Sequence, residues 1–249
     1  MDFNREIRIR IYKAIENLEA CQRFADGHGQ VLASYGIKKV TSSDTKWFYN
    51  KDVYMVMVES VSGDKVFGGA RLHLKNESYK LPLEKAIENI DPRINTLVLS
   101  KDGYKTGELC GLWNTKSMSG SGLSAILIRV GVAKAGLFAY KEFNLKYLFT
   151  LSSPWTINMV KDLGFEIETS IGQNGGFDYP TPEFKAYVLK LKDINNLKKA
   201  KVNERKNIFN LRENPIQRRT ENGPKGKIEV EYNLIFSNTE KTNNLQDES

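Results

Sequence analysis

The chain has 249 residues, 40% of them hydrophobic, which is enough for a proper buried core. No apolar run is long enough to cross a bilayer, and the opening MDFNREIRIR lacks the apolar centre of a signal peptide. Two cysteines and two histidines indicate neither a disulfide framework nor a metal-ligand cluster. We therefore expect a cytoplasmic protein with no metal and no membrane span.

The positive charge is concentrated late in the chain. The formal net charge is +7, but residues 185–227 alone hold 13 Lys or Arg against 4 Asp or Glu, a charge of +9, so the remainder carries −2. A basic segment suits an acidic partner, such as nucleic acid, an acidic protein or phosphates. A solvated face with no partner explains it equally well.

The first elements follow from hydrophobic spacing. Isoleucines alternate with polar residues over residues 6–12, which predicts a half-buried strand. Helical spacing follows over residues 13–36, where Gly27 and Gly29 are expected to split the segment into two helices and Gly36 to cap its end.

The pattern then alternates between strands and helices up to residue 192. The expected elements are a strand hairpin at 52–60 and 65–74, a helix at 81–90, a strand at 103–114, a helix at 122–143, a strand at 146–153, a helix at 154–164, and strands at 165–172 and 183–192. The helix at 122–143 is apolar on nearly every face, which predicts that it is buried. This order predicts an α/β fold, a mixed sheet with helices on both faces.

The composition changes near residue 193. We expect one domain over residues 1–193, a basic C-terminal extension over 194–236, and a polar tail over 237–249 that is disordered. Within the extension, residues 194–214 are a helix candidate and residues 227–236 a strand candidate.

The stretch SMSGSG lies between a predicted strand and the buried helix. The first amides of a helix have no backbone partner and the helix dipole favours negative charge there, so such a turn can bind an anion. Gly120 and Gly122 remove side chains that would block a phosphate, while Ser117, Ser119 and Ser121 can add hydroxyl donors. A flexible linker is the alternative interpretation. The stretch matches neither a dinucleotide fingerprint nor a Walker loop.

In context, this stretch resembles the acetyl-coenzyme-A-binding motif of the GCN5-related N-acyltransferases, Arg/Gln-x-x-Gly-x-Gly/Ala. Gly120 and Gly122 match the motif, and Ser117 replaces its leading Arg or Gln. The element order from about residue 5 to 192 is similar to the order in that fold. Residues 163–165, Leu-Gly-Phe, resemble the end of its next helix.

One branch is more similar still. The stretches FGGARLHLKNESYKLP and GELCGLWN resemble parts of acyl-homoserine-lactone synthases and N-acyl amino acid synthases. Their Gly-x-x-Arg-Leu strand is represented by GARL, which contains Arg71. Their Glu-x-Ser-Arg becomes Glu108-Leu109-Cys110-Gly111, so the Glu is kept and the Ser and Arg are lost. The resemblance therefore does not extend to homoserine-lactone chemistry itself.

The resemblance implies an N-acyltransferase with a mostly antiparallel sheet that splays open near residues 112 and 147. It would move an acyl group from the phosphopantetheine thioester of acyl-CoA or acyl carrier protein to a small amine or amino acid, by direct attack. A backbone N–H of Leu112 or Trp113 would point at the thioester carbonyl. Glu108 would be the general base or an amine anchor, unless it is a surface strand carboxylate.

The remaining donor contacts are implied in the same way. The donor phosphate would meet amides near Ser119 to Gly122, and Ser153 stands where an Asn is common at the start of the next helix. Cys110 shares a face with Glu108, and core packing is a better interpretation of it than a nucleophile.

The basic segment leaves alternatives open. It would suit docking of an acidic acyl carrier protein, or it would make the chain a non-catalytic binding module of the same fold. Nucleic acid is a weaker candidate, because few aromatic residues interleave with the basic ones. The basic residues concerned are Lys190, Lys192, Lys198, Lys199, Lys201, Arg205 and Lys206.

Overall fold

The computed structural model describes residues 5–37, 44–99, 103–139 and 144–235. The strands are β1 (Arg5–Lys13), β2 (Val53–Glu59), β3 (Val66–Leu74), β4 (Lys105–Asn114), β5 (Leu145–Ser152), β6 (Glu166–Ile167), β7 (Gly176–Asp178), β8 (Lys185–Leu191), β9 (Ile216–Gly223) and β10 (Gly226–Asn233). The α-helices are α1 (Leu18–Ser34), α2 (Pro82–Ile87), α3 (Arg93–Leu97), α4 (Leu123–Leu137), α5 (Ile157–Asp162) and α6 (Val202–Glu213).

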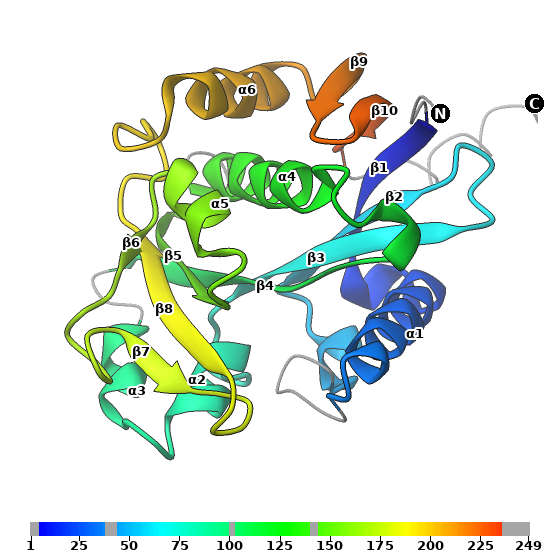
Figure 1. Ribbon diagram of the computed structural model, residues 1–249. Coiled ribbons are helices and arrows are strands. Elements are labelled where there is room, and N and C mark those ends of the chain that lie inside the picture. Colours follow the sequence, from blue (N-terminus) through cyan, green and yellow to red (C-terminus); the bar gives the residue numbers. More distant parts are fainter. Residues whose placement is uncertain (1–4, 38–43, 100–102, 140–143, 236–249) are drawn as a thin grey trace, which may run out of the picture.

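All these strands belong to one mixed sheet in the order β6-β8-β5-β4-β3-β2-β1-β10-β9, with β7 on β8 (Figure 1). Two pairs are parallel, β4 with β5 and β1 with β10, and the others are antiparallel. The predicted mixed, mostly antiparallel sheet is confirmed.

Helices cover both faces of the sheet, as predicted. Figure 1 shows α1 on one face, α4 on the other, and α6 over α4 on the side away from the sheet. Twelve of the 15 residues of α4 are buried, because the sheet covers one side and α6 the other. The prediction that this helix is buried is confirmed, and its two flanking layers explain why it is apolar all round.

The sheet opens between β4 and β5. The two strands pair from Lys105 and Leu145 up to Glu108 and Phe149, and β4 then continues to Asn114 without β5 beside it. The opening predicted near residues 112 and 147 is therefore present, although on β5 the pairing persists to residue 149. The separation leaves one edge of β4 free for another chain or ligand.

The helix predicted over residues 13–36 is not split by its glycines. After a short 3₁₀ turn, α1 runs unbroken through Gly27 and Gly29, and Gly36 follows it with a φ of 72°. A Cβ on Gly27 would lie 2.1 Å from the Trp113 ring. The glycine therefore makes room for an aromatic ring, a long-range need that local helix propensity cannot reveal.

The C-terminal extension joins the same sheet. Its helix candidate is α6, its strand candidate is β10, and β10 pairs in parallel with β1. The strand β9 was not predicted because its sequence, IQRRTENG, lacks alternating apolar residues. The expected disordered tail, 237–249, lies outside the described residues.

Other differences lie near β5 and β8. The strand predicted over 165–172 is only Glu166–Ile167, and the helix predicted over 154–164 shortens to α5, which begins after Pro154. The short α3 and β7 were not predicted. The elements α3 and β7 pack against α2, β5 and β8 in a separate hydrophobic cluster, so tertiary contacts determine them.

Candidate active site at the opening of the sheet

A β-bulge on β4 marks the opening. Trp113 pairs with Gly69 and Cys110 with Arg71, so two residues of β4 oppose one residue of β3. Gly111 lies in this bulge with a φ of 59°, a conformation that suits glycine. The bulge bends β4 locally, and the strand pairs with β3 again at Trp113 and Asn114.

The two residues predicted to carry the thioester-facing amide lie on opposite faces beyond the bulge. The Leu112 side chain packs on the core that contains α4, and Trp113 packs in the cluster with Phe24 of α1. The Thr115 amide donates to the carbonyl of Phe67 in β3. Because the ladder alternates, the Trp113 amide also faces β3, which favours Leu112 for the free edge.

Glu108 lies where β4 and β5 separate. It is 1% exposed, and its Oε2 accepts a hydrogen bond from the Leu83 amide at 2.8 Å. Burial raises the pKa of this carboxyl to about 8, although the Leu83 amide and the Arg71 charge oppose the rise. The alternative of a surface strand carboxylate does not hold, because the group is buried. A carboxyl with a pKa near neutrality can exchange a proton.

Arg71, which the sequence analysis placed in a motif without assigning it a role, carries a charge that interacts with Glu108. It is fully buried, with its guanidinium 4.3 Å from the Trp47 ring centroid and 5.4 Å from that of Phe24. These aromatic faces favour a positive charge, although burial lowers the pKa of Arg71. The GARL motif in the sequence pointed to Arg71. No sequence pattern pointed to Trp47, which lies in a different segment of the chain.

A small cavity adjoins this cluster. Among the residues that line it are Asp44, Trp47, Arg71, His73, Tyr79 and Lys85. The His73 side chain is 4% exposed, and its Nε2 has no hydrogen-bond partner among the described residues. Burial keeps its pKa well below the usual value, so the ring is neutral. The cavity thus offers both charged and neutral polar groups to a polar ligand.

Cys110 pairs with Arg71 on β3. The Glu108 carboxylate is close enough to act on the Cys110 thiol, in keeping with the shared face expected for Glu108 and Cys110. Burial, followed by the Glu108 charge, raises the pKa of the Cys110 thiol. A thiol kept protonated is a poor nucleophile, which agrees with the packing role expected for it.

Ser117 lies within a short 3₁₀ turn, Lys116–Met118, and the other residues predicted to bind phosphate at this turn lie between it and α4. Ser117 and Ser119 are exposed, and Gly120 and Gly122 have φ values of 72° and 91°. Ser121 differs, because its hydroxyl is buried, donates to the Met118 carbonyl at 2.7 Å and accepts from the Leu123 amide. Ser121 therefore stabilises the turn through these internal hydrogen bonds.

The turn keeps donors for a ligand. Among the described residues, the amides of Gly120, Gly122 and Ser124 have no acceptor. A Cβ on Gly120 would lie 2.8 Å from the Cε atom of Lys225, which sequence reasoning did not identify. Lys225 comes from the β9–β10 turn, more than a hundred residues away.

Ser153 follows the carboxyl end of β5, across the opening from β4. Its carbonyl accepts hydrogen bonds from the amides of Thr156 and Ile157, and its hydroxyl lies 3.4 Å from that of Thr156. Ser153 therefore organises the start of α5, and its hydroxyl is half-exposed.

Many basic side chains of the C-terminal segment bind groups of the chain itself. Lys199 pairs with Glu166 at 2.6 Å, and Lys201 pairs with Asp162 at 2.9 Å. The Nζ of Lys190 lies 3.9 Å from the Tyr147 ring centroid. These contacts hold surface segments together.

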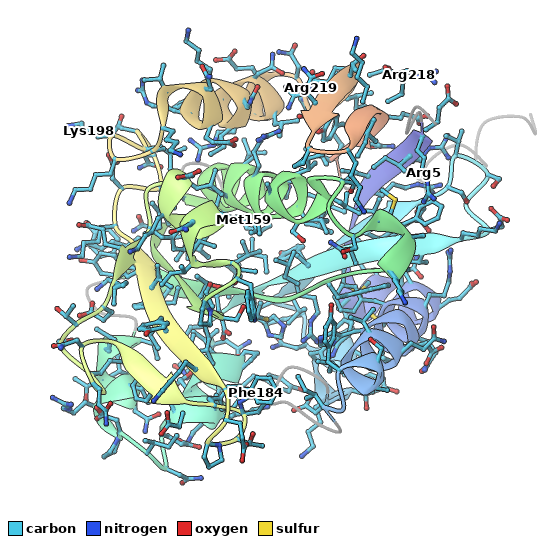
Figure 2. The ribbon with its side chains drawn as sticks, viewed as in Figure 1. Arg5, Met159, Phe184, Lys198, Arg218 and Arg219 are labelled. Atoms are coloured by element: carbon cyan, nitrogen blue, oxygen red, sulfur yellow. The ribbon has the colours of Figure 1, made fainter. Side chains whose placement is uncertain are left out.

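Others lie exposed. Figure 2 shows Lys198 projecting from the loop before α6, and Lys192 and Lys206 are exposed as well. Arg205 donates from Nε to the Asn196 carbonyl at 2.7 Å. The free part of the basic surface is therefore smaller than the net charge of the segment indicates.

Within the described residues, no three His, Cys, Asp or Glu side chains gather in a way that could hold a metal ion. In the same part of the chain, no helix combines the length and the apolar character needed to cross a membrane.

Comparison with known proteins places this geometry in a fold family. Neither a protein-family model nor a curated protein matches the sequence. Solved structures do match. FeeM, an N-acyl amino acid synthase from uncultured soil microbes, matches with a TM-score of 0.52 at 17% identity, over 75% of this chain and 91% of its own.

Two further structures match to a similar extent. BjaI, a CoA-dependent acyl-homoserine lactone synthase with bound isopentyl-CoA, has a TM-score of 0.53 at 11% identity, over 82% of this chain and 88% of its own. Escherichia coli ElaA has a TM-score of 0.51 at 9% identity, over 74% of this chain and 98% of its own. The chain therefore has the fold of the GCN5-related N-acyltransferases, and an N-acyl amino acid synthase and an acyl-homoserine lactone synthase are among the structures that share it.

Proposed function

We propose that the protein is an N-acyltransferase that moves an acyl group from a phosphopantetheine thioester to an amine by direct attack. The observation that carries this proposal is the opening between β4 and β5, which begins at the buried Glu108 and continues past the bulge at Gly111 towards the glycine turn. The likeness in fold to acyltransferases supports it.

The donor arm fits this opening. Its phosphate would meet the amides of Gly120 and Gly122 at the start of α4, where the helix dipole favours an anion. The arm would lie along the free edge of β4, and the Leu112 amide would donate to the thioester carbonyl. That amide would stabilise the negative charge on the carbonyl oxygen in the transition state.

The amine would approach from the side of Glu108 and Arg71. Its nitrogen attacks the thioester carbon, the C–N bond forms, and the carbonyl oxygen takes the negative charge. Collapse of this intermediate breaks the C–S bond and expels the thiolate. The Glu108 carboxylate accepts the proton that the nitrogen loses, and the thiolate takes a proton from water.

The acceptor would lie beside the cavity at Arg71, which has a volume of about 10 Å³ and room for about one water molecule. The lining of the cavity includes the cationic Arg71 and Lys85, the neutral His73, and the Asp44 carboxylate, which pairs with Lys85 at 3.2 Å. The Arg71 charge suits an acceptor with a carboxylate, and holding the carboxylate on that side would place the amine at the opening. A small amine or amino acid is therefore the proposed acceptor class.

A non-catalytic module that acts through its basic segment is the alternative. The ion pairs of Lys199 and Lys201 with the chain itself weigh against it, since those charges already have partners. The buried Glu108 has a raised pKa and lies at the opening, which a purely structural module would not need.

Activity with a panel of donors and acceptors tests the proposal. The purified chain would be incubated with acyl-CoA or acyl carrier protein thioesters of increasing chain length and a mixture of amino acids and small amines. Mass spectrometry should detect a product heavier than one amine by the acyl group, together with free thiol. The Glu108→Gln variant should lose most of this product. Equal product from wild type and variant would contradict the role of Glu108, and no product with any donor would favour the alternative.

A further inference from the structure

The turn of the β9–β10 hairpin packs directly on the glycine turn before α4. A Cβ on Gly223 would lie 1.8 Å from the carbonyl oxygen of Ser121, and one on Gly122 would lie 3.3 Å from the Cα of Gly223. Two backbone segments, one from the middle of the chain and one from its C-terminal part, are thus in contact, which only glycine permits.

Lys225 lies at the tip of this hairpin. Its Nζ donates a hydrogen bond to the Ser119 carbonyl at 2.6 Å, and its Cε lies 2.8 Å from where a Cβ of Gly120 would be. The ammonium group therefore lies against the turn that presents the Gly120 and Gly122 amides. It has three N–H donors, and Ser119 uses one. The side chain is exposed, so a ligand can reach it.

The hairpin is held firmly in this place. Its strand β10 pairs with β1 from Arg5 and Ile228 onward, and Glu221 of β9 binds Arg129 of α4 at 2.8 Å. Arg5 also donates from Nη1 to the Met118 sulfur at 3.2 Å, which ties β1 to the same turn. The position of Lys225 is thus set by the fold and does not depend on a loose loop.

We propose that Lys225 binds a phosphate of the acyl donor and forms the outer wall of its site. The proposal rests on the proposed function and adds to it a ligand from the appended hairpin. The amides of Gly120, Gly122 and Ser124 are directional but neutral donors, whereas the ammonium supplies a full charge, and charge-assisted hydrogen bonds to phosphate are the stronger kind. A phosphate bound between them would connect the C-terminal hairpin to the opening of the sheet.

Binding of three related probes tests the proposal. Calorimetry would measure the dissociation constants of coenzyme A, 4′-phosphopantetheine and pantetheine, of which the last has no phosphate. Lys225→Ala should weaken coenzyme A binding about tenfold, as expected for a lost hydrogen bond to a charged group. It should leave pantetheine binding unchanged. The matched control is Lys227→Ala, an exposed lysine two residues along, which should bind all three probes like the wild type.

The outcomes separate the possibilities. If Lys225→Ala binds both coenzyme A and 4′-phosphopantetheine more weakly, Lys225 contacts the phosphate that coenzyme A shares with a carrier protein. If the variant binds only coenzyme A more weakly, Lys225 contacts a phosphate of the nucleotide. Unchanged coenzyme A binding in Lys225→Ala, with a wild type that binds, overturns the proposal. Tighter binding also overturns it, since the lysine would then obstruct the site. A wild type that binds none of the probes would instead contradict the donor site of the proposed function.

Discussion

Arg129 of α4 and Glu221 of β9 form an ion pair of 2.8 Å in which both side chains are about nine-tenths buried. Glu204 of α6 binds the same guanidinium at 2.7 Å, and the Tyr232 hydroxyl of β10 donates to Glu221 at 2.7 Å. One arginine of the buried helix thus anchors both parts of the C-terminal extension.

Replacing Glu221 by Ala should lower the free energy of unfolding by roughly 3 to 5 kcal/mol, because the change leaves Arg129 buried with one partner fewer. Urea denaturation measures this. Glu231→Ala is the matched control in the same hairpin, because Glu231 pairs with Arg8 at 2.7 Å in a half-exposed position. The control should lose less than about 1 kcal/mol. If both variants lose a similar free energy of unfolding, the buried network contributes no more stability than a surface ion pair.

The rate of acyl transfer should rise with pH through about 8 and then level off, because burial raises the pKa of Glu108 to about 8 and a general base acts when deprotonated. The measurement is kcat/KM from pH 6 to 10. A weakly basic amine, neutral throughout this range, keeps the acceptor's own ionisation out of the profile. A profile in Glu108→Gln with the same inflection would assign it to another group.

The stability of the fold should also respond to Glu108. Its folded pKa of about 8 lies above the ordinary value of 4.5, so the folded state binds this proton more tightly than the unfolded state does. The contribution of Glu108 to the free energy of unfolding is therefore fully present below about pH 4.5. It is lost as the pH rises towards 8, by at most about 1.4 kcal/mol per pH unit. Urea denaturation at pH 5 and pH 8.5 should show a smaller fall for Glu108→Gln than for the wild type. Parallel falls would contradict the raised pKa.

Gly120→Val should abolish tight donor binding. The branched side chain would enter the space beside Lys225 where the phosphate approaches. The matched control is Gly36→Val, because Gly36 has the same φ of 72° but nothing within 4 Å of its Cβ position. Both variants should lose roughly 1 to 2 kcal/mol of stability from the strained backbone, and only Gly120→Val should lose coenzyme A binding in calorimetry. If Gly120→Val still binds coenzyme A like the wild type, the glycine turn before α4 is only a linker and not a phosphate site.

Carrier docking can be tested on the exposed lysines. Lys198→Glu with Lys206→Glu should raise the KM for a carrier-bound donor several-fold, since opposite charge speeds encounter with an acidic carrier. The KM for acyl-CoA should stay nearly constant. Lys51→Glu with Lys65→Glu makes the same change in charge at exposed positions elsewhere. If the Lys198 and Lys206 changes raise the KM for both donors, or if the control pair raises the KM for the carrier-bound donor equally, the carrier does not dock at Lys198 and Lys206.

The sequence predicted the parts of the fold that local pattern determines. The strands at both sides of the opening, the buried α4 and the glycine turn follow from periodicity and turn chemistry. Glu108 was identified as a candidate from a motif, but its burial depends on α2, where the Leu83 amide meets it.

The contacts that sequence reasoning missed connect distant segments. Trp47 lies over Arg71, and Lys225 lies over Gly120, although each pair is far apart along the chain. The polar strand β9 has no apolar alternation, because its neighbours α4 and β10 present it with charged partners such as Arg129. A single sequence contains no signal for such pairings.

The parallel pairing of β1 with β10 has a consequence for biosynthesis. Arg5 leaves the ribosome well before its partner Ile228, because most of the described chain lies between them. During translation β1 therefore has one unpaired edge until β10 has been made, and such a long-range strand pairing favours slow folding and exposure to chaperones. Nascent chains that stop before β9 should lack the wall that Lys225 forms beside Gly120, so full donor binding should appear only after the β9–β10 hairpin has been made.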